Sequence, residues 1–378
     1  MKRPISRRRL FGVIRDGGLN ALGNPFQKRL DDFIRTARTR RLDEVLVFGQ
    51  ATLRALTGID CDNACLQLHP SLSFAPVLYT DFRYVPMVHR EAPWLKVCDL
   101  KRLNRADKRG RAGARPSPRR IGCEFAMSHA RFERLRTECP RAKFVDVTED
   151  LAALRAVKTP EEIEKLRVAE RITCEIWNTA SAAFRPGMTE REMARLIRKM
   201  IIDRADGESF ETIVCVGANA AECHHVPDDT VWDGRAGVLV DMGVRLDGYC
   251  ADLTRNLRPR RPSVAYRAAY ELVLKANRAA IAAVKPGLSA GALDRVARRI
   301  IADGGFGKCF GHSLGHGVGL EIHEAPTARK GSKTILKPGM LVTIEPGIYL
   351  EGNFGVRIED LVLVTETGCE VLSVAAAK

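Results

Sequence analysis

Short apolar runs and amphipathic stretches alternate along the first 150 residues of the chain. Residues 28–42 place Leu30, Phe33 and Ala37 on one helical face, and residues 128–139 read as a second helix. Between and around these stretches lie runs that read as strands, at residues 44–49, 77–80, 96–100, 120–124 and 143–147. Strands that alternate with helices predict an α/β domain with a partly parallel sheet.

A strong helix start marks the boundary between two predicted domains. Thr159 fits the N-cap position, Pro160 fits the first helical position, and the two glutamates that follow favour the first turn. We therefore predict an N-terminal α/β domain at residues 26–154 and a second domain at residues 155–378. We expect the basic residues 1–25 that precede both domains to be disordered.

The second domain contains an internal repeat. A Pro-Gly turn followed by a helix occurs at residues 185–203 and again, one hundred residues later, at residues 285–303. An apolar strand that ends in an acid follows each helix, at Asp241 and at Glu345. Chance reuse of Pro-Gly turns is the alternative, but order and spacing both repeat. The repeat predicts two halves related by a pseudo-twofold axis, with these two acids facing each other across it.

Each of these acids has a second acid on the far side of a predicted turn. Asp241 and Asp252 bracket an Asp-Gly turn signal, which places them near each other on paired strands. Glu345 and Glu359 bracket Gly352 in the same way. Two carboxylates held close together in a partly buried site repel each other and need a compensating positive charge.

A glycine-rich segment with three histidines lies between the two acid pairs. It holds His312, His316 and His323, and glycines among histidines favour a metal or acid–base site over a packed core. His316 adds a nitrogen ligand to the four acids, and such an oxygen-rich set suits two divalent ions about 3.5–4 Å apart. The predicted metal ligands are Asp241, Asp252, His316, Glu345 and Glu359.

These five positions resemble the metal ligands of the pita-bread metallopeptidases, family M24, in order, spacing and flanking sequence. The flanking motifs are Val240-Asp-Met-Gly243, Ala251-Asp-Leu-Thr-Arg255, Gly315-His-Gly-Val-Gly319, Thr343-Ile-Glu-Pro-Gly347 and Arg357-Ile-Glu-Asp360. The N-terminal domain is similar, more loosely, to the creatinase/prolidase N-terminal domain, chiefly at Leu56-Thr-Gly58 and Tyr79-Thr-Asp-Phe-Arg-Tyr84. The resemblance implies an α+β pita-bread (creatinase/aminopeptidase) fold with duplicated halves, preceded by a creatinase-like α/β domain.

Four further residues resemble positions of the Xaa-Pro branch of this family, which contains prolidase and aminopeptidase P. His312 and His323 flank the metal histidine at the family's spacings, and His224 lies upstream of the first aspartate. Arg357 stands two residues before the last glutamate. The resemblance implies that His224 and His312 position the scissile bond, that His323 stabilises the oxyanion, and that Arg357 orients a metal-bridging carboxylate. His225 departs from the family's usual Pro-His-Gly pattern, which leaves substrate choice open.

The net charge of +15 comes largely from two basic segments, residues 2–9 and 101–120. The second segment contains glycines and prolines and is predicted to be a flexible surface loop. Contact with nucleic acid would use such charge. No aromatic residues are interleaved there to stack on bases, so a solvated loop is favoured and a nucleic-acid partner is not expected.

The cysteine pattern and the hydropathy of the chain indicate a cytoplasmic protein. The eleven cysteines are scattered and form no Cys-x-x-Cys pair, which argues for reduced thiols. No apolar run approaches the ~20 residues that a membrane-spanning helix needs, so no membrane partner is expected.

Together these features predict a dinuclear-metal peptidase that hydrolyses Xaa-Pro bonds, of the aminopeptidase P or prolidase type. A hydroxide bridging the two ions would attack the carbonyl group, and Glu345 would carry the proton. Manganese is the first choice of metal, with cobalt, zinc or iron as alternatives, and the family suggests a homodimer. The substrate would be a peptide with proline at its second position. A non-prolyl aminopeptidase, or a catalytically silent binding protein that uses its basic loops for nucleic acid, stays open as the alternative.

Overall fold

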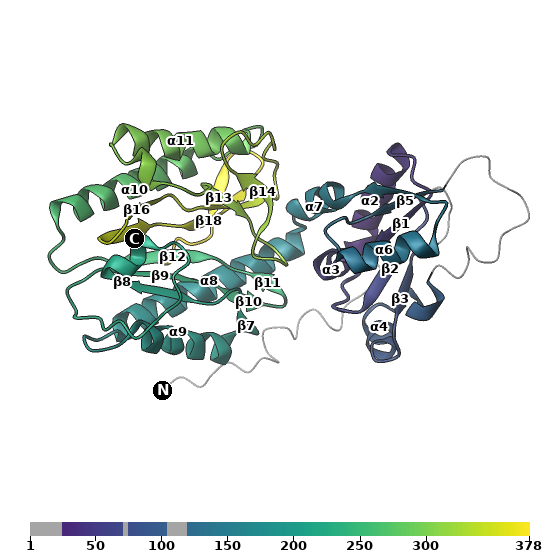
Figure 1. Cartoon of the computed structure of the whole chain (residues 1–378), viewed down its shortest axis with the longest axis horizontal. Helices are drawn as coiled ribbons and strands as arrows, with labels where there is room; N and C mark the ends of the chain where they lie inside the picture. The colour runs from purple at the N-terminus through teal and green to yellow at the C-terminus, as the bar shows by residue number, and fades with distance from the viewer. Residues whose placement is uncertain (1–24, 71–74, 104–118) are drawn as a thin grey trace, which may run out of the picture. The chain divides into compact units, whose positions relative to one another are not determined.

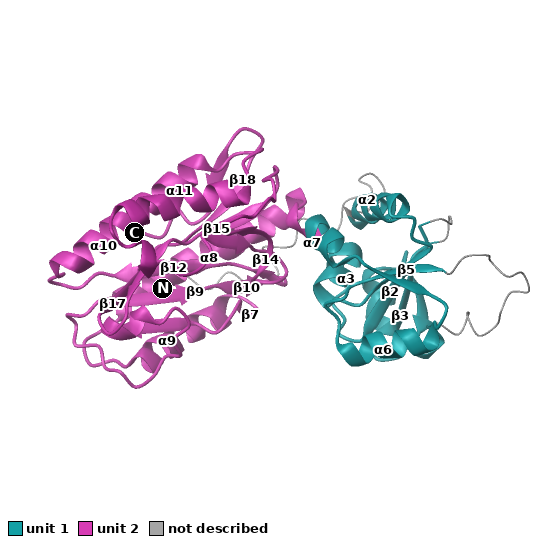
Figure 2. Ribbon diagram, turned by 45° about the horizontal axis from the view of Figure 1, so that its top comes forward, with its two compact units in different colours: residues 1–154 teal, residues 155–378 magenta. Residues whose placement is uncertain are grey.

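Two compact units make up the chain, one at residues 1–154 and one at residues 155–378, each with its own hydrophobic core (Figure 2). The computed structural model describes residues 25–70, 75–103 and 119–378. Nearly all of the N-terminal segment predicted to be disordered, and most of the predicted basic loop at 101–120, therefore lie outside the described residues.

The N-terminal unit is a six-stranded mixed sheet in the order β4-β3-β2-β1-β5-β6 (Figure 1). β2 runs antiparallel to both of its neighbours, whereas the β1–β5, β5–β6 and β3–β4 pairs are parallel. Its elements are α2 (Pro25–Thr39), β1 (Glu44–Val47), α3 (Gln50–Thr57), β2 (Ala64–Leu68), β3 (Val77–Thr80), α4 (Val85–Glu91), β4 (Lys96–Asp99), η1 (Leu100–Arg102), β5 (Arg120–Cys123), α6 (His129–Glu138), β6 (Lys143–Asp146) and α7 (Thr148–Ala156). The predicted partly parallel sheet is confirmed.

Side chains alternate between the two faces of this sheet because successive residues of a strand point to opposite sides. Val45 and Val47 of β1 join one core cluster with Leu30 and Phe33 of α2. Leu46, between the two valines, joins a second cluster that includes Leu135 of α6. The sheet is therefore buried on both faces, which explains why β1 reads as a continuous apolar run rather than an alternating one.

The C-terminal unit places strands between two pairs of helices, α8 with α9 and α10 with α11 (Figure 1). Its elements are α8 (Pro160–Ala183), α9 (Glu190–Arg204), β7 (Gly207–Glu208), β8 (Ile213–Val216), η2 (Gly217–Ala221), β9 (Val238–Met242), β10 (Val244–Leu246), β11 (Tyr249–Cys250), β12 (Leu253–Leu257), α10 (Val264–Ala283), α11 (Ala290–Asp303), η3 (Gly307–Cys309), β13 (Gly315–Gly317), β14 (Glu324–Ala328), β15 (Leu341–Ile344), β16 (Gly347–Leu350), β17 (Phe354–Arg357), β18 (Asp360–Val364) and β19 (Cys369–Val371). The first helix pair packs on the β12-β9-β8 sheet, and the second pair packs on the sheet built from β15 and β18.

The predicted duplication of this unit is confirmed by matching turns one hundred residues apart. Gly187 and Gly287 both adopt positive φ, at 96° and 84°, in the turn that joins the two helices of each pair. Thr189 and Ser289 then cap the shorter helices with their side-chain oxygens. Both capping residues also form an isolated bridge to a later segment of the same half. The two halves therefore repeat a helix–turn–helix unit with its anchoring contacts.

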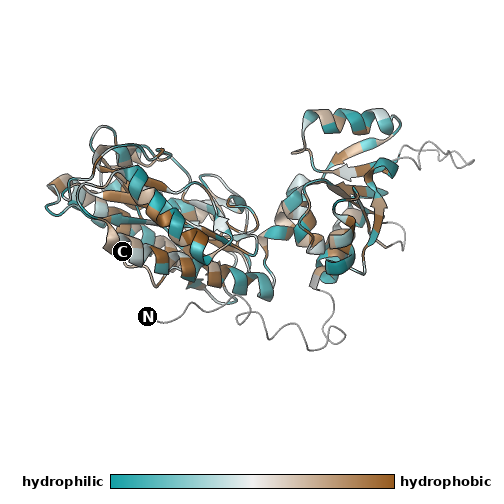
Figure 3. Cartoon of the chain, turned by 90° about the horizontal axis from the view of Figure 1, so that it is seen from below, coloured by the Kyte–Doolittle hydropathy of each residue, from teal (hydrophilic) through white to brown (hydrophobic). Residues whose placement is uncertain are grey.

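The helices of both units carry hydrophilic and hydrophobic residues side by side, as Figure 3 shows by colour. This mixture is expected for helices that bury one face against a sheet and expose the other. Among the described residues, no helix combines the length and the apolar character needed to cross a membrane. All eleven cysteines carry free thiols.

Candidate metal centre

A β-hairpin in the second half brings two glutamates together. β16 pairs with β17, and Gly352 in their turn has φ of 67°, which favours glycine. Ile344 pairs with Asp360 on one side, and Gly347 pairs with Arg357 on the other, so Glu345 and Glu359 stand opposite each other between the two ladders. The predicted hairpin is confirmed, and the carboxylates occupy neighbouring positions on the paired strands.

The hairpin of the first half places its two aspartates diagonally rather than directly opposite. Asp247 and Gly248 both have positive φ, at 49° and 77°, in the turn between β10 and β11, as the Asp-Gly signal predicts. Asp241 pairs with Thr254 across the β9–β12 ladder, and Asp252 comes two residues before that threonine. Because residues two apart on a strand share a face, both carboxylates still lie on one side of the hairpin.

His316 lies on the short strand β13 and reaches the acids through its Nε2 atom. Its Nδ1 atom lies 3.0 Å from the carbonyl oxygen of Gly317 and donates to it, which leaves Nε2 as the acceptor nitrogen of a neutral ring. Nε2 lies 3.4 Å from Glu345 Oε1 and 3.6 Å from Asp252 Oδ2. The ligand atoms of Asp252, His316 and Glu359 all lie within 4.8 Å of one another.

Burial and mutual repulsion perturb the titration of these groups. Burial raises the pKa of Glu345 to about 8, with Arg357 opposing the rise and Asp241 adding to it. Burial and the charges of the neighbouring acids likewise raise the pKa values of Asp252 and Glu359 well above their usual range. Burial lowers the pKa of His316 to about 4, so its ring is neutral near pH 7.

This set of donor atoms is suited to bind cations. Lone pairs of a neutral imidazole and of several carboxylates converge on one space, which is unfavourable unless positive charge lies between them. Asp241 Oδ1 is buried and has no hydrogen-bond partner among the described residues. Oxygen ligands with one imidazole nitrogen suit divalent ions such as manganese, cobalt, iron or zinc.

Arg357 connects several of these side chains. Its Nη2 atom donates to Asp241 Oδ2 at 2.7 Å, and its Nε atom donates to Thr254 Oγ1 at 3.0 Å. The threonine hydroxyl in turn donates to Glu359 Oε2 at 2.7 Å. On the other side of the site, Thr343 Oγ1 donates to Glu345 Oε1 at 3.1 Å and accepts from the His316 backbone N–H at 3.0 Å.

Sequence reasoning missed Thr254, Thr343 and Tyr349 as members of this network. Thr254 of β12 comes two residues after Asp252, and Thr343 of β15 comes two residues before Glu345, so the two-residue period of extended chain places each threonine on its ligand's face. That period was the signal that could have found them. Tyr349 OH accepts from Arg357 Nη1 at 3.0 Å and bonds His312 Nε2 at 2.9 Å. Nothing in the sequence identifies the tyrosine without the fold of the hairpin.

Two of the three other predicted histidines, His312 and His323, lie beside the cluster. His312 Nδ1 lies 3.9 Å from Glu345 Oε2, and burial lowers the pKa of this histidine to about 4. The His323 ring stands edge-on to the His316 ring, with their centroids 4.4 Å apart. His224 is exposed. The other eight predicted site residues therefore lie in or beside one cluster.

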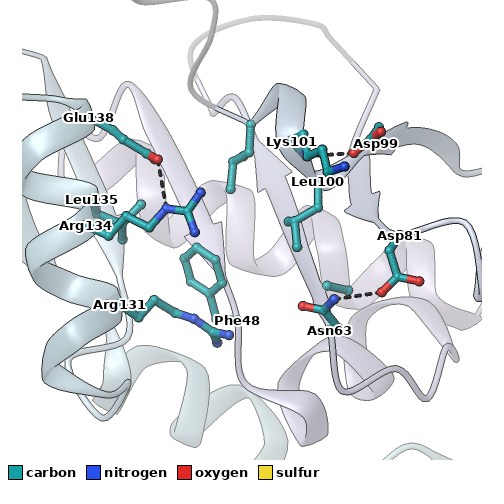
Figure 4. A pocket seen from close by; sticks show the side chains of 12 residues that line it. Phe48, Asn63, Asp81, Asp99, Leu100, Lys101, Arg131, Arg134, Leu135 and Glu138 are labelled. Carbon is teal, nitrogen blue, oxygen red and sulfur yellow. Dashed lines mark hydrogen bonds and ion pairs between the residues drawn. The ribbon is translucent and has the colours of Figure 1, made fainter.

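A pocket of about 590 Å³ in the N-terminal unit contains none of the predicted site residues (Figure 4). It lies at the edge where β1, β3 and β4 end, and helix α6 forms one of its sides. Its polar side chains bond each other, as in the Arg134–Glu138 pair at 2.9 Å and the Asn63–Asp81 pair at 2.7 Å. We place no catalytic group there.

Comparison with known proteins identifies both units. Residues 29–157 match the creatinase/prolidase N-terminal domain, and residues 164–366 match metallopeptidase family M24. The chain is 38% identical to an Xaa-Pro dipeptidase of Pyrococcus furiosus over 254 residues, which are 67% of this chain and 73% of that protein.

Solved structures resemble the whole chain. An Xaa-Pro dipeptidase from Bacillus anthracis is 29% identical and superposes with a TM-score of 0.85, over 93% of this chain and 99% of that one. An X-Pro aminopeptidase from Thermotoga maritima is 31% identical, with a TM-score of 0.78 over 90% of this chain and 97% of that one. The resemblance seen in the sequence and the predicted pita-bread fold are both confirmed, and the chain belongs to metallopeptidase family M24.

Proposed function

We propose that this metallo-exopeptidase cleaves Xaa-Pro bonds with two divalent ions held by the four carboxylates and His316. The observation that carries the proposal is the convergence of buried acids whose pKa values are raised. Repulsion of this kind lowers the stability of the protein, and a pair of cations is the simplest group that removes it. Similarity to Xaa-Pro dipeptidases supports proline as the second residue of the substrate.

The proposed ligands are Asp241, Asp252, His316, Glu345 and Glu359. When bound, two divalent ions would supply a water molecule that ionises near neutral pH and positive charge beside the substrate carbonyl group. The choice among manganese, cobalt, zinc and iron depends on which metal is available to the protein and on the coordination geometry, and not on the donor types alone. We propose manganese as the first metal to test.

The side chains around the ligands would handle the peptide and the proton. Glu345 would take the proton of the attacking water and pass it to the proline nitrogen as the C–N bond breaks. His323 would donate a hydrogen bond to the oxyanion that develops on the carbonyl oxygen, an effect worth ~3–4 kcal/mol for a well-placed donor. His224 and His312 would hold the scissile bond and the proline side. Arg357 would keep Asp241 oriented through its 2.7 Å hydrogen bond.

A cleavage assay after metal exchange tests this function. The purified chain would be stripped with a chelator, dialysed, and reconstituted separately with manganese, cobalt and zinc. Gly-Pro and Ala-Pro would be compared with Xaa-Pro-Xaa peptides and with Ala-Ala as the non-prolyl control. We expect no cleavage without metal, restored cleavage with manganese or cobalt, and a strong preference for proline at the second position.

Each contrary result points to a different alternative. Full activity of the stripped protein would remove the metals from the chemistry. Equal cleavage of Ala-Ala and Ala-Pro would indicate a non-prolyl aminopeptidase. Salt-dependent binding of RNA or DNA with no cleavage of any peptide would indicate a binding protein on a peptidase fold. The ratio of dipeptide to tripeptide rates would decide between the prolidase type and the aminopeptidase P type.

A further inference from the structure

A second cluster of titratable side chains lies at the start of helix α9, outside the predicted metal ligands. Its members are Glu190, the first residue of the helix, and His225 and Asp228 from the loop between η2 and β9. One potential ligand atom of each lies within 4.8 Å of the others. The Glu190 side chain is fully buried, whereas the His225 side chain is 11% exposed.

Hydrogen bonds already use the oxygens that a metal ion would need. Glu190 Oε1 accepts from the backbone N–H of Val216 at 2.6 Å and from Asn219 Nδ2 at 3.0 Å. Glu190 Oε2 accepts from His225 Nε2 at 2.7 Å and from the backbone N–H of Asp228 at 3.1 Å. Four donors occupy the roughly four lone-pair sites of a carboxylate. The positive end of the α9 dipole also disfavours a cation there. The cluster is therefore a network of hydrogen bonds centred on Glu190.

His225 takes part in this network by donating its Nε2 proton to Glu190. Its other nitrogen, Nδ1, lies 3.4 Å from Glu222 Oε2. Burial alone would lower the pKa of His225, but the hydrogen bond and charge of Glu190, helped by Glu222 and Asp228, outweigh burial and raise it. His225 therefore faces three carboxylates, one at the start of α9 and two in the loop that carries the histidine.

Backbone hydrogen bonds hold the C-terminal end of the same loop against α9. The N–H of Glu190 donates to the Thr230 carbonyl oxygen at 3.1 Å, and the N–H of Arg191 donates to the Asp228 carbonyl oxygen at 3.1 Å. At the N-terminal end, the backbone N–H of Val216 and the side chain of Asn219 donate to the Glu190 carboxylate. Between these two ends, the His225 side chain bonds the helix start. The residue before it, His224, is exposed and is one of the predicted substrate-binding residues.

We propose that His225 is a positioning residue, whose hydrogen bond to Glu190 holds the loop at residues 217–231 in the conformation that presents His224 to the substrate. The contribution to catalysis rests on the peptidase function proposed above; the contribution to the loop does not. The departure from the family's small residue at this position then adds an anchor to the loop.

Three variants test the proposal in the metal-loaded protein. We expect His225→Ala to lower kcat/KM for an Xaa-Pro peptide about 10- to 100-fold, because a displacement of His224 of about 1 Å is enough for such a loss. His225→Gln keeps an N–H donor for Glu190 and should recover most of that loss. Asp229→Ala is the matched control, since Asp229 forms an exposed ion pair with Arg191 from the same loop to the same helix turn. It should stay within about twofold of the parent, as exposed pairs contribute little.

Hydrogen exchange separates this proposal from the peptidase assignment. We expect faster amide exchange across residues 217–231 in His225→Ala, above all at Asp228, with parent-like exchange in His225→Gln and Asp229→Ala. If the parent cleaves no Xaa-Pro peptide, the proposed function fails while exchange still tests the anchor. Unchanged exchange together with unchanged kcat and KM in His225→Ala would overturn the anchor. Stoichiometric loss of a third bound divalent ion in that variant would replace the anchor with a metal site.

Discussion

Each of the five predicted ligands has a neighbour that hydrogen-bonds one of its atoms. Thr343 bonds Glu345, Thr254 bonds Glu359, and Arg357 bonds Asp241. The backbone carbonyl of Gly317 fixes the ring of His316, and Glu170 accepts from the backbone N–H of Asp252 at 3.3 Å. Such contacts restrict the orientation of each ligand before an ion binds, which is how outer contacts tune a metal site.

Replacing Glu345 should change activity and metal-free stability in opposite directions. We expect Glu345→Gln to lose at least ~10³-fold in kcat/KM, since it removes both a proposed ligand and the proton carrier. The metal-free form should become more stable, because one of several mutually repelling buried carboxylates is gone. Cleavage assays and thermal melts of the stripped protein measure both effects.

Glu351→Gln is the control, because Glu351 is an exposed glutamate in the turn of the same hairpin. It should match the parent in both assays. An active Glu345→Gln variant would remove this residue from the chemistry.

The hydroxyl group of Tyr349 should matter beyond packing. Tyr349→Phe keeps the ring but leaves Arg357 Nη1 without its acceptor, at a cost of about 1–3 kcal/mol for a buried donor. It also frees His312 Nε2. We expect kcat/KM to fall about 10- to 100-fold while the fold is kept, as measured by peptide cleavage and circular dichroism.

Tyr266→Phe serves as the comparison for that variant. Tyr266 is a buried tyrosine of α10 that stacks on Tyr270 and meets Phe354 edge-on. It should retain parent-like kcat and KM. Equal losses in the two variants would show that the Tyr349 effect is general to buried tyrosines.

At the scale of elements, turn chemistry was predictable and exact register was not. The Asp-Gly signal and Gly352 correctly predict both hairpins, because tight hairpin turns need positive φ, which aspartate and glycine adopt more readily than most residues. The sequence could not reveal that one acid pair is direct and the other diagonal, since a one-residue change in pairing alters which side chains meet. It also gave no prediction of strand β2 or of helices α3 and α4, which are short segments held by tertiary packing.

The close approach of β13 to β15 depends on a missing side chain. A Cβ atom built on Gly315 would lie 1.9 Å from the Thr343 carbonyl oxygen, so Gly315→Ala must push the strand that carries His316 away from β15. We expect this variant to bind metal about 10- to 100-fold more weakly and to be destabilised by about 1–3 kcal/mol. Titration of the stripped protein with manganese and chemical denaturation give the two values.

Gly311→Ala is the matched control for that substitution. A Cβ atom at Gly311 would meet nothing within 4 Å, and the residue lies in the same glycine-rich segment. Its stability and metal affinity should stay within about 0.5 kcal/mol of the parent. Parent-like metal binding by Gly315→Ala would contradict the role assigned to the strand contact.

At the scale of the whole molecule, the internal repeat was the most informative feature of the sequence. It predicted the duplicated halves of the C-terminal unit, because a helix–turn–helix with capped starts recurs with the same anchoring contacts. The partly parallel sheet of the N-terminal unit followed from predicted strands that alternate with helices, and the structure buries it on both faces. The strand order, with antiparallel β2 inside the sheet, depends on long-range pairing that no local pattern encodes.

The stability of the metal-free protein should fall as the pH rises. Burial raises the pKa of Glu345 to about 8 and that of Glu170 to about 7, against about 4.3 for glutamate in an unfolded chain. The folded state therefore holds protons that the unfolded state has released. This contribution to stability is complete below about pH 4 and is lost as the pH rises through about 8.

Thermal melts of stripped and manganese-loaded protein at pH 6 and pH 8.5 check this dependence. We expect the stripped protein to lose about 5 °C or more over that range, and the loaded protein to lose less because the ions offset the repulsion. Stripped Glu345→Gln should show a shallower fall than the parent. A stripped parent that is more stable at pH 8.5 would contradict the assigned direction.

Because the acids are divided between the two repeats, a chain must be fully synthesised and folded before it can be active. Asp241 and Asp252 come from the first repeat, and Glu345 and Glu359 come from the second, more than ninety residues later. A chain that stops after the first repeat carries only two of the five predicted ligands and lacks His316. Under the proposed assignment, fragments released by a stalled ribosome or a protease cannot cleave cellular peptides, so the activity is confined to the finished molecule.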